Sequence, residues 1–382
     1  MARAGDLGKR IAQARIDLGL TQEGLAKRLG VARTTVAEIE TARRKVTAEE
    51  LHRLAELLRR PLDYFFNPVR PRTVFALRAD NDEASGPVRE ALVALDNRLA
   101  DLRRLEVFSG ISVRAAVGRY QLAEWRRVDY AATHVARDER RRLELGTRPV
   151  NSLRETLENK IGLMAFGMYV PRGGFSGAFA FDGERAAMLV NLAHFAGRVN
   201  FTLAHEYGHA IIAEQGAHVD LRGGRATKEE HFANRFAAEF LMPLPALEEA
   251  LDHYRLSPPG LTEDQLVMLA SFFGVSFAAL LGRLEHFSIV SRETGDTLRK
   301  SARPVQRIRE LGLQDPRGPF PPLPTTYRHM AFTAFHRKSI SRSRLAELLQ
   351  VDVEEAEGGY QAWLAGAMRL QEGPGEGGCA AT

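Results

Sequence analysis

The sequence is poor in the residues that build disulfide frameworks and membrane spans. Its only cysteine among 382 residues is Cys379, in a glycine-rich tail, so no disulfide forms within the chain and cysteine cannot dominate a metal site. No apolar run approaches the roughly 20 residues that a transmembrane helix needs. The first 20 residues are charged throughout and lack the apolar core of a signal peptide. We therefore expect a cytoplasmic protein that does not contact a membrane.

The excess of basic residues is confined to one end of the chain. Residues 1–72 contain 15 Lys or Arg and 9 Asp or Glu, a net charge of +6, whereas the whole chain carries +5. A basic segment of this kind is expected in a domain that meets a phosphate backbone, but it also occurs in domains that are merely soluble. The length corresponds to two or three domains.

Residues 1–72 carry apolar residues at helical spacing, in short blocks separated by turn signals. The pattern predicts helices over about 7–18, 21–29, 33–42 and 48–59, and a last turn after Pro61. The second and third helices are joined by a tight turn at Gly30–Val31, which makes a helix-turn-helix.

In a DNA-binding helix-turn-helix, the N-terminal residues of the second helix reach base edges in the major groove. Arginine can bind guanine in a bidentate manner, and threonine can pack on a thymine methyl group. A helical protein-interaction module of the same fold is the alternative. The candidate DNA contacts are Arg33, Thr34, Thr35 and Glu38 for base edges, and Gln22, Arg43 and Arg44 for phosphates.

The block from Leu7 to Leu58, which includes LTQEGLAKRLGVARTTVAEIE, resembles the Xre (lambda-repressor-like) helix-turn-helix family. The resemblance implies a five-helix domain over residues 1–72 that binds an operator in double-stranded DNA. Such regulators bind paired half-sites as homodimers. Ala42 stands where the family usually has glycine; because alanine disfavours a left-handed backbone, we expect this loop to differ slightly.

Residues 73–149 are predicted to be a linker and a helical connector. The linker is marked by Pro68, Pro71 and the polar run 78–86. Leucines at intervals of three and four indicate a helix after residue 87, and a second helix is expected from about 112 to 145. The charged run RDERRR at 137–142 within it is typical of a solvated helix face. One more helix is expected over 150–161, capped by Asn151 or Ser152.

Strand patterns follow at 162–170, 177–183 and 186–191, the last two as a hairpin. This small sheet precedes the segment FTLAHEYGHAIIA. There, His205 and His209 are four residues apart, so both rings lie on one face of a helix, as two ligands of one Zn²⁺ require. Zinc lowers the pKa of a water molecule that it binds, and Glu206 can take the proton of that water.

A third ligand is expected on the helix EEHFANRFAAEFLMP, residues 229–243. Glu230 is favoured over Glu229 because Asn234 lies one turn above it, placed to hydrogen-bond a ligand histidine. Two histidines and one glutamate leave a fourth position open, as in zinc peptidases. The weaker candidates for an auxiliary catalytic role are His218, His231 and His253.

Residues from about 150 to 245 resemble the ImmA/IrrE family of metallopeptidases, through AHEYGHAII and EHFANRFAAEFLMP. The resemblance implies that His205, His209 and Glu230 bind Zn²⁺, with Mn²⁺ as the alternative, and that Glu206 is the general base. It also implies a protein substrate, a helix-turn-helix repressor. The rival interpretation is a transcription regulator or antitoxin-like protein whose peptidase-like domain only senses a ligand or a metal.

The fold predicted for the whole chain is α+β and mainly α. We expect the peptidase domain over 150–290, with packed helices in 261–291, and a helical extension over 291–371. The extension contains a Pro-rich linker at 312–324 and a second turn-helix pattern at 330–349, interpreted as a packed cap or a small binding unit. Residues 372–382 are expected to be disordered.

Overall fold

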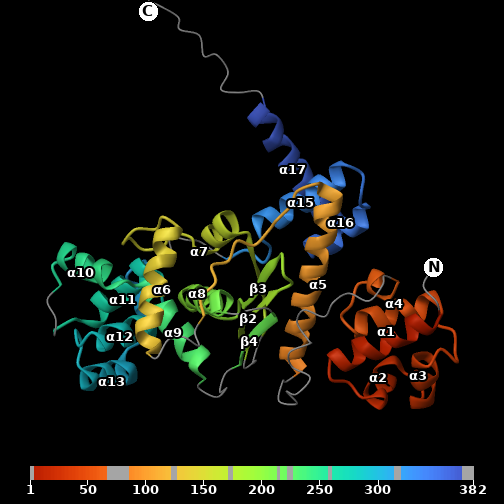
Figure 1. Ribbon diagram of the computed structural model, residues 1–382, viewed down its shortest axis with the longest axis horizontal. Helices are drawn as coiled ribbons and strands as arrows, with labels where there is room; N and C mark the ends of the chain where they lie inside the picture. Colours follow the sequence, from red (N-terminus) through yellow and green to blue (C-terminus); the bar gives the residue numbers. More distant parts are fainter. Residues whose placement is uncertain are drawn as a thin grey trace, which may run out of the picture. The chain divides into compact units, whose positions relative to one another are not determined.

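The computed structural model describes residues 4–66, 86–121, 127–170, 175–212, 216–221, 227–256, 260–313 and 320–371. The chain forms two compact units. One comprises Met1–Leu99 and Arg114–Pro322, the other Ala100–Val113 and Leu323–Thr382. Most of the predicted linker, and the tail 372–382, lie outside the described residues. The fold is mainly helical with one small sheet, so the predicted α+β class is confirmed (Figure 1).

The N-terminal helices begin and end where the sequence places its capping residues. They are α1 (Ala4–Asp17), α2 (Gln22–Leu29), α3 (Arg33–Glu40), α4 (Ala48–Leu57) and the 3₁₀ turn η1 (Leu62–Phe65). Thr21 caps α2 by accepting a hydrogen bond from the Gly24 amide, and Gly30 ends that helix at φ 77°. Thr47 and Glu50 form a capping box on α4.

The core of this domain continues into the next helix. Ile11, Leu25, Val36 and Leu58 are fully or almost fully buried together with Val93, which belongs to α5 (Gly86–Ser109). The helix predicted after residue 87 is therefore present, and its first half packs with the N-terminal domain.

The helix predicted from 112 is wrong over its first part: the described residues 110–121 form neither helix nor strand. Gly110, at φ 71°, ends the preceding helix. The Ala115 amide then donates to the Glu184 carbonyl, and the Tyr120 amide to the Ile211 carbonyl. These long-range bonds replace the hydrogen bonds of a helix. The helix resumes as α6 (Val128–Arg142).

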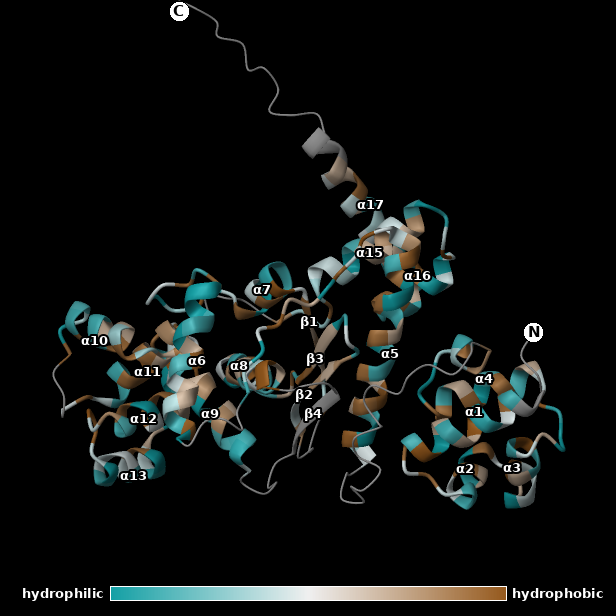
Figure 2. Ribbon diagram, viewed as in Figure 1, coloured by the Kyte–Doolittle hydropathy of each residue, from teal (hydrophilic) through white to brown (hydrophobic). Residues whose placement is uncertain are grey.

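The sheet has four strands in the order β1-β3-β2-β4. They are β1 (Leu163–Met168), β2 (Phe175–Phe181), β3 (Ala186–Asn191) and β4 (Gly216–Leu221). β1 and β3 are parallel, and β2 pairs antiparallel with β3 and β4. Every residue of β2 and β3 is buried, and Figure 2 shows hydrophobic residues along these strands. β4 was not predicted.

Helices that precede and follow these strands along the chain complete the domain. The short α7 (Leu153–Thr156) continues as a π-helical turn, η3 (Leu157–Ile161), before β1. α8 (Ala196–Ile212) packs against β2 and β3, and α9 (Lys228–Leu241) packs against both α6 and α8. The chain continues through α10 (Leu244–His253), α11 (Glu263–Phe273), α12 (Phe277–His286), α13 (Arg292–Ser301) and α14 (Pro304–Glu310).

The predicted extension 291–371 is divided between the two compact units: its part up to Pro322 belongs to the first unit and the rest to the second. The second unit contains the end of α5 with α15 (Thr325–His336), α16 (Arg342–Leu349) and α17 (Val353–Gln371). Among the described helices, none is long and apolar enough to span a bilayer by itself; α11 and α12 reach that measure only as a pair bent by 100°.

Candidate metal centre

The two histidines of the HEYGH segment point to one spot. α8 carries both, and both side chains are almost completely buried, with 4% and 2% of the residues exposed. Their Nε2 atoms are 3.1 Å apart. The four-residue spacing brings the rings together because it is close to one helical turn.

α9 supplies the third group of this cluster. Oε2 of Glu230 lies 3.4 Å from Nε2 of His205, and Oε1 lies 3.5 Å from Nε2 of His209. Among the described residues, these three form a group of potential metal ligands whose atoms lie within 4.8 Å of one another. Glu229 is exposed and is not in the group.

The spacing of these atoms fits zinc. A tetrahedral ion with bonds of about 2.0–2.1 Å to nitrogen and oxygen requires ligand atoms roughly 3.3–3.4 Å apart. The three separations of 3.1, 3.4 and 3.5 Å lie close to that value. Two imidazoles and one carboxylate are also a donor set that zinc accepts, and they leave one tetrahedral position for water or substrate.

Glu206 follows the first histidine and is fully buried. Its side chain lies against Gly177 of β2: a Cβ atom placed there would be 3.0 Å from Oε1 of Glu206 and 2.6 Å from Cγ2 of Thr202. The strand comes this close because it has no side chain at that position. β2 therefore packs directly against this carboxylate.

The opposite face of α8 is fixed by a buried carboxylate. Glu139 of α6 is fully buried and accepts hydrogen bonds from the hydroxyls of Tyr207 and Tyr120 and from the guanidinium of Arg142. Burial, and then the Glu139 charge, raise the pKa of Tyr207 above its ordinary value. Because Tyr207 lies between the two histidines in the sequence, this network holds their helix from behind.

The charged run at 137–142 is therefore only partly a solvated face, and that prediction is wrong for two of its members. Glu139 and Arg140 are buried, with 0% and 4% of each residue exposed. Partners far along the chain account for this, since Tyr207 bonds Glu139 and the Phe240 carbonyl accepts from Arg140.

A second buried ion pair holds α9. The Glu239 carboxylate accepts two hydrogen bonds from the fully buried guanidinium of Arg283, and others from Arg235 and Thr133. Burial alone would raise the pKa of Glu239, but the hydrogen bonds and charge of Arg283 hold that pKa below its usual value. The helix that carries Glu230 is thus tied to α6 and α12.

Asn234 does not make the hydrogen bond predicted for it. Its amide donates to the backbone carbonyl of Glu230 at 3.0 Å, not to a ligand histidine. A polar side chain in a helix readily bonds the carbonyl four residues earlier, because that carbonyl lies directly below it. His231 pairs with Asp129 at 3.1 Å, and His253 is exposed at the end of α10. The structure does not describe the side chain of His218.

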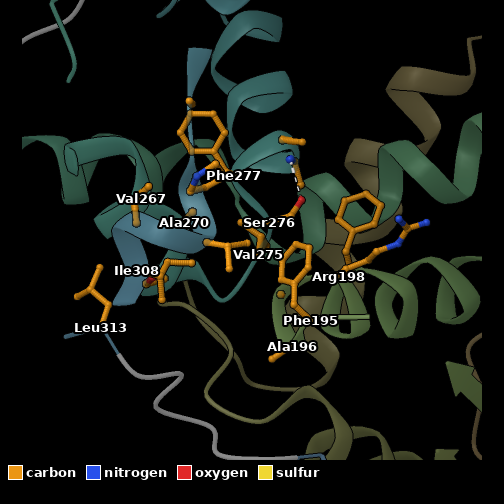
Figure 3. Close-up of a pocket in the computed structure, with 18 of the residues that line it drawn as sticks. Phe195, Ala196, Arg198, Val267, Ala270, Val275, Ser276, Phe277, Ile308 and Leu313 are labelled. Atoms are coloured by element: carbon orange, nitrogen blue, oxygen red, sulfur yellow. Dashed lines mark hydrogen bonds between the residues drawn. The ribbon is translucent and has the colours of Figure 1, made fainter. Parts of the chain in front are cut away.

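A pocket of about 830 Å³ opens beside the metal cluster, and His205 and Asn234 are part of its wall. Its other walls are mainly apolar and come from α8, α11, α12 and α14. Figure 3 shows Phe195, Val275 and Ile308 around this space. Sequence patterns do not indicate the pocket, because its lining residues come from segments spread over more than 100 residues of the chain.

The predicted base contacts lie together at the start of α3, where Arg33, Thr34 and Glu38 are exposed and Thr35 is half-buried. The predicted phosphate contacts differ among themselves. Gln22 donates to Glu40 at 2.9 Å, and Glu40 also pairs with Arg15. Arg44 pairs with Glu50 at 2.6 Å, whereas Arg43 is exposed.

The loop after α3 keeps the left-handed backbone despite its alanine. Ala42 has a φ of 58°, and its amide donates to the Ile39 carbonyl. The expectation that this loop would differ is thus not met: the chain accepts alanine where glycine would be less strained.

Comparison with known proteins matches two domain families. Residues 11–65 match the helix-turn-helix family and residues 174–285 match the IrrE N-terminal-like domain. The chain therefore combines an Xre-like helix-turn-helix domain with an IrrE-like peptidase domain, as the sequence predicted.

Two curated relatives match these domains. The chain is 38% identical over 98 residues to the radiation response metalloprotease IrrE of Deinococcus radiodurans, covering 24% of this chain and 29% of the relative. It is 39% identical over 61 residues to an uncharacterized transcriptional regulator in the ATPase CF(0) region of Rhodospirillum rubrum, covering 16% and 56%. The chain thus spans less than two thirds of either relative.

One solved structure aligns over most of the chain without indicating a shared fold. It is Bacillus thuringiensis PlcR in complex with the peptide PapR7 and DNA. The alignment covers 96% of this chain and 97% of that one, at 10% identity, but the TM-score is only 0.16.

Proposed function

We propose that this protein is a DNA-binding transcriptional regulator coupled to a zinc-dependent endopeptidase. The observation that carries the proposal is the metal centre. Two imidazoles and a carboxylate have the separations of a tetrahedral zinc site, and a buried glutamate lies next to them in the sequence. The similarity to a metalloprotease supports the same conclusion.

In this proposal His205, His209 and Glu230 hold the metal, with Mn²⁺ as the alternative to Zn²⁺. When bound, the metal would act as a Lewis acid that polarises a peptide carbonyl and makes a water molecule acidic. Glu206 accepts the proton of the attacking water and returns it to the departing amine nitrogen. Gly177 leaves room for this carboxylate, because no side chain of β2 occupies the same space.

The apolar pocket beside the cluster suits a polypeptide substrate with large apolar side chains next to the scissile bond. We propose that the substrate is a regulatory protein of the helix-turn-helix repressor type. Such a protein contains amphipathic segments whose apolar residues become available when it opens.

The DNA-binding half of the proposal rests on α3. Arg33, Thr34, Thr35 and Glu38 face the base edges, and Arg43 lies next to the phosphates. Gln22 and Arg44 already have partners within the protein. When DNA is bound, their remaining hydrogen-bond donors reach its phosphate backbone. We propose a homodimer on two half-sites.

The variant Glu206→Gln tests catalysis. It should keep its zinc and its DNA binding, because Gln has nearly the same shape and Glu206 is not a ligand. It should lose 10²–10⁴-fold in hydrolysis, the usual contribution of a general base. Used as bait in its own cells, it should retain an intact protein that the wild type cleaves. Glu229→Gln, which removes an exposed neighbouring charge, is the matched control.

A regulator that only senses a ligand or metal gives a different result. Its transcript levels would be unchanged in Glu206→Gln but altered in His205→Ala, which removes a metal ligand. That pattern, with no protein trapped by the bait, would refute the peptidase.

A further inference from the structure

A second pocket, of about 640 Å³, lies apart from the metal centre. One wall is formed by α6, from Thr133 to Arg141, and by Glu144 just after that helix; it lies opposite Arg235 and Glu239 of α9 and Phe287. None of the residues that line it lines the apolar pocket at the metal cluster. We call it the arginine pocket, after Arg137, Arg140, Arg141 and Arg235 in its wall.

Three of these arginines crowd one face of one helix. Arg137 is followed by Arg140 and Arg141 at i+3 and i+4, and like charges at these spacings destabilise an isolated helix. The C-terminal end of a helix carries partial negative charge and attracts cations, but that effect falls off within the last turn. Arg137, more than one turn before the end of α6 at Arg142, gains little from it.

The two acidic groups of the pocket are already bound to basic side chains. Glu239 is bonded by Arg283, which does not line the pocket, and by Arg235, which does. Glu144 pairs with Lys160 at 2.9 Å. On α6 itself, Arg141 pairs with Asp138 at 3.2 Å. Among the described residues no carboxylate pairs with Arg137 or Arg140, so the pocket keeps an excess of positive charge.

Arg140 is the most informative of the four. It is 4% exposed and donates to three backbone carbonyls, those of Gly146, Arg148 and Phe240. Burial lowers its pKa to about 10. Among the residues that the structure describes, no carboxylate bonds its guanidinium. A buried cation that has carbonyl partners but no counter-ion is costly, and an anion in the pocket would remove that cost.

The remaining wall is apolar and shaped for more than a bare phosphate. Ala136, Leu244 and Phe287 line it. α10 begins at the same place, at Pro243 and Leu244, so its partial positive charge adds to that of the arginines. A volume of 640 Å³ lies within the range of small-molecule sites, roughly 300–1,000 Å³.

We infer that the arginine pocket binds a small phosphorylated metabolite of about mononucleotide size, with the phosphate on Arg137, Arg140 and Arg141 and an apolar or ring portion against Leu244 and Phe287. Guanidinium groups bind phosphate through paired hydrogen bonds, which favours this class over a simple carboxylate. Because α9 carries both Arg235 and Glu230, a ligand in this pocket touches the helix that completes the metal centre.

The experiment is a calorimetric titration of the full chain with AMP, pyrophosphate and inorganic phosphate at constant ionic strength. We expect saturable binding of AMP, tighter than that of inorganic phosphate. The variant Arg137→Gln/Arg141→Gln should weaken AMP at least tenfold. Arg292→Gln/Lys300→Gln removes the same two charges from exposed positions of α13 and should leave the affinity unchanged.

A melting curve of each variant without ligand separates lost binding from lost folding. Arg137 and Arg141 are exposed, so both double variants should melt like the wild type. Three results would overturn the inference: no saturable binding of any probe, equal weakening in both double variants, or phosphate binding as tightly as AMP. Since the readout is heat of binding, the result does not depend on whether the protein is a peptidase.

Discussion

Replacing Ala42 by glycine should stabilise the N-terminal domain. The residue follows α3 at a φ of 58°, in the left-handed region that costs an L-residue about 1–2 kcal/mol. The strain is maintained by the chain around it, since the Arg43 and Arg44 amides both bond the Glu38 carbonyl and so close the helix end. Glycine adopts the same backbone without that cost.

The net gain is smaller than the strain. Glycine has more freedom in the unfolded chain than alanine, which takes back about 0.4–1 kcal/mol. The expected stabilisation is therefore roughly 0.5–1 kcal/mol. Ala37→Gly is the matched control with the opposite sign, because Ala37 lies inside α3 and glycine there costs about 0.8–1 kcal/mol.

Amide hydrogen exchange of the full chain measures both effects at their site. A stabilisation of about 0.7 kcal/mol slows exchange of the most protected amides of residues 11–65 roughly threefold, since they exchange through opening of the domain. Ala37→Gly should speed the same amides by a similar factor. Equal or faster exchange in Ala42→Gly would mean that the loop is not strained, and the reasoning from φ would be refuted.

Three more outcomes are expected. His209→Ala should bring zinc content, measured by atomic absorption, from about one ion per chain to near zero; an unchanged content would rule out the cluster as the site. Arg33→Ala should cost about 1–3 kcal/mol at one base pair and relax the preference among duplexes, whereas uniform weakening on every duplex would make Arg33 a phosphate contact. Gly177→Ala should keep its metal yet lose about 10²-fold in hydrolysis, because the new Cβ pushes against Thr202 at 2.6 Å and Glu206 at 3.0 Å and displaces both side chains; full activity, as expected for Gly282→Ala, where a Cβ meets no atom within 4 Å, would contradict it.

The parts of the fold that sequence predicts well are those fixed by neighbours in the chain. The four N-terminal helices follow from local caps such as Thr21 and Thr47 and from a left-handed glycine at 30. The four-residue spacing of His205 and His209 likewise predicts that their rings lie close together, because a single helix carries both. Glu230 could be predicted as their partner only by its register, and the structure places it there.

The predictions that fail concern segments whose secondary structure depends on hydrogen bonds with distant parts of the chain. The segment after Gly110 has helical periodicity, but its amides find carbonyls near residues 161, 184 and 211 instead. The sequence pattern does not predict β4, although Ala217, Val219 and Leu221 alternate with His218 and Asp220. This alternation is the only local signal of the strand, and six residues between two helices are too short a stretch to identify it. Its pairing with β2 is what makes it a strand.

The burial of α6 changes where the peptidase domain begins. By sequence it starts near residue 150, and α6 is assigned to a connector. In the structure Val135, Ala136 and Leu143 share one core with Leu203 and Phe236.

The buried carboxylate of α6 also accepts a hydrogen bond from the hydroxyl of Tyr207, which lies on the face of α8 opposite His205 and His209. A carboxylate with three donors is stable only while all three are present, because each lost partner leaves buried charge uncompensated. The two histidines therefore depend for their position on a helix that precedes the motif by about 60 residues. α6 shares one core with the helices that carry the histidines and Glu230.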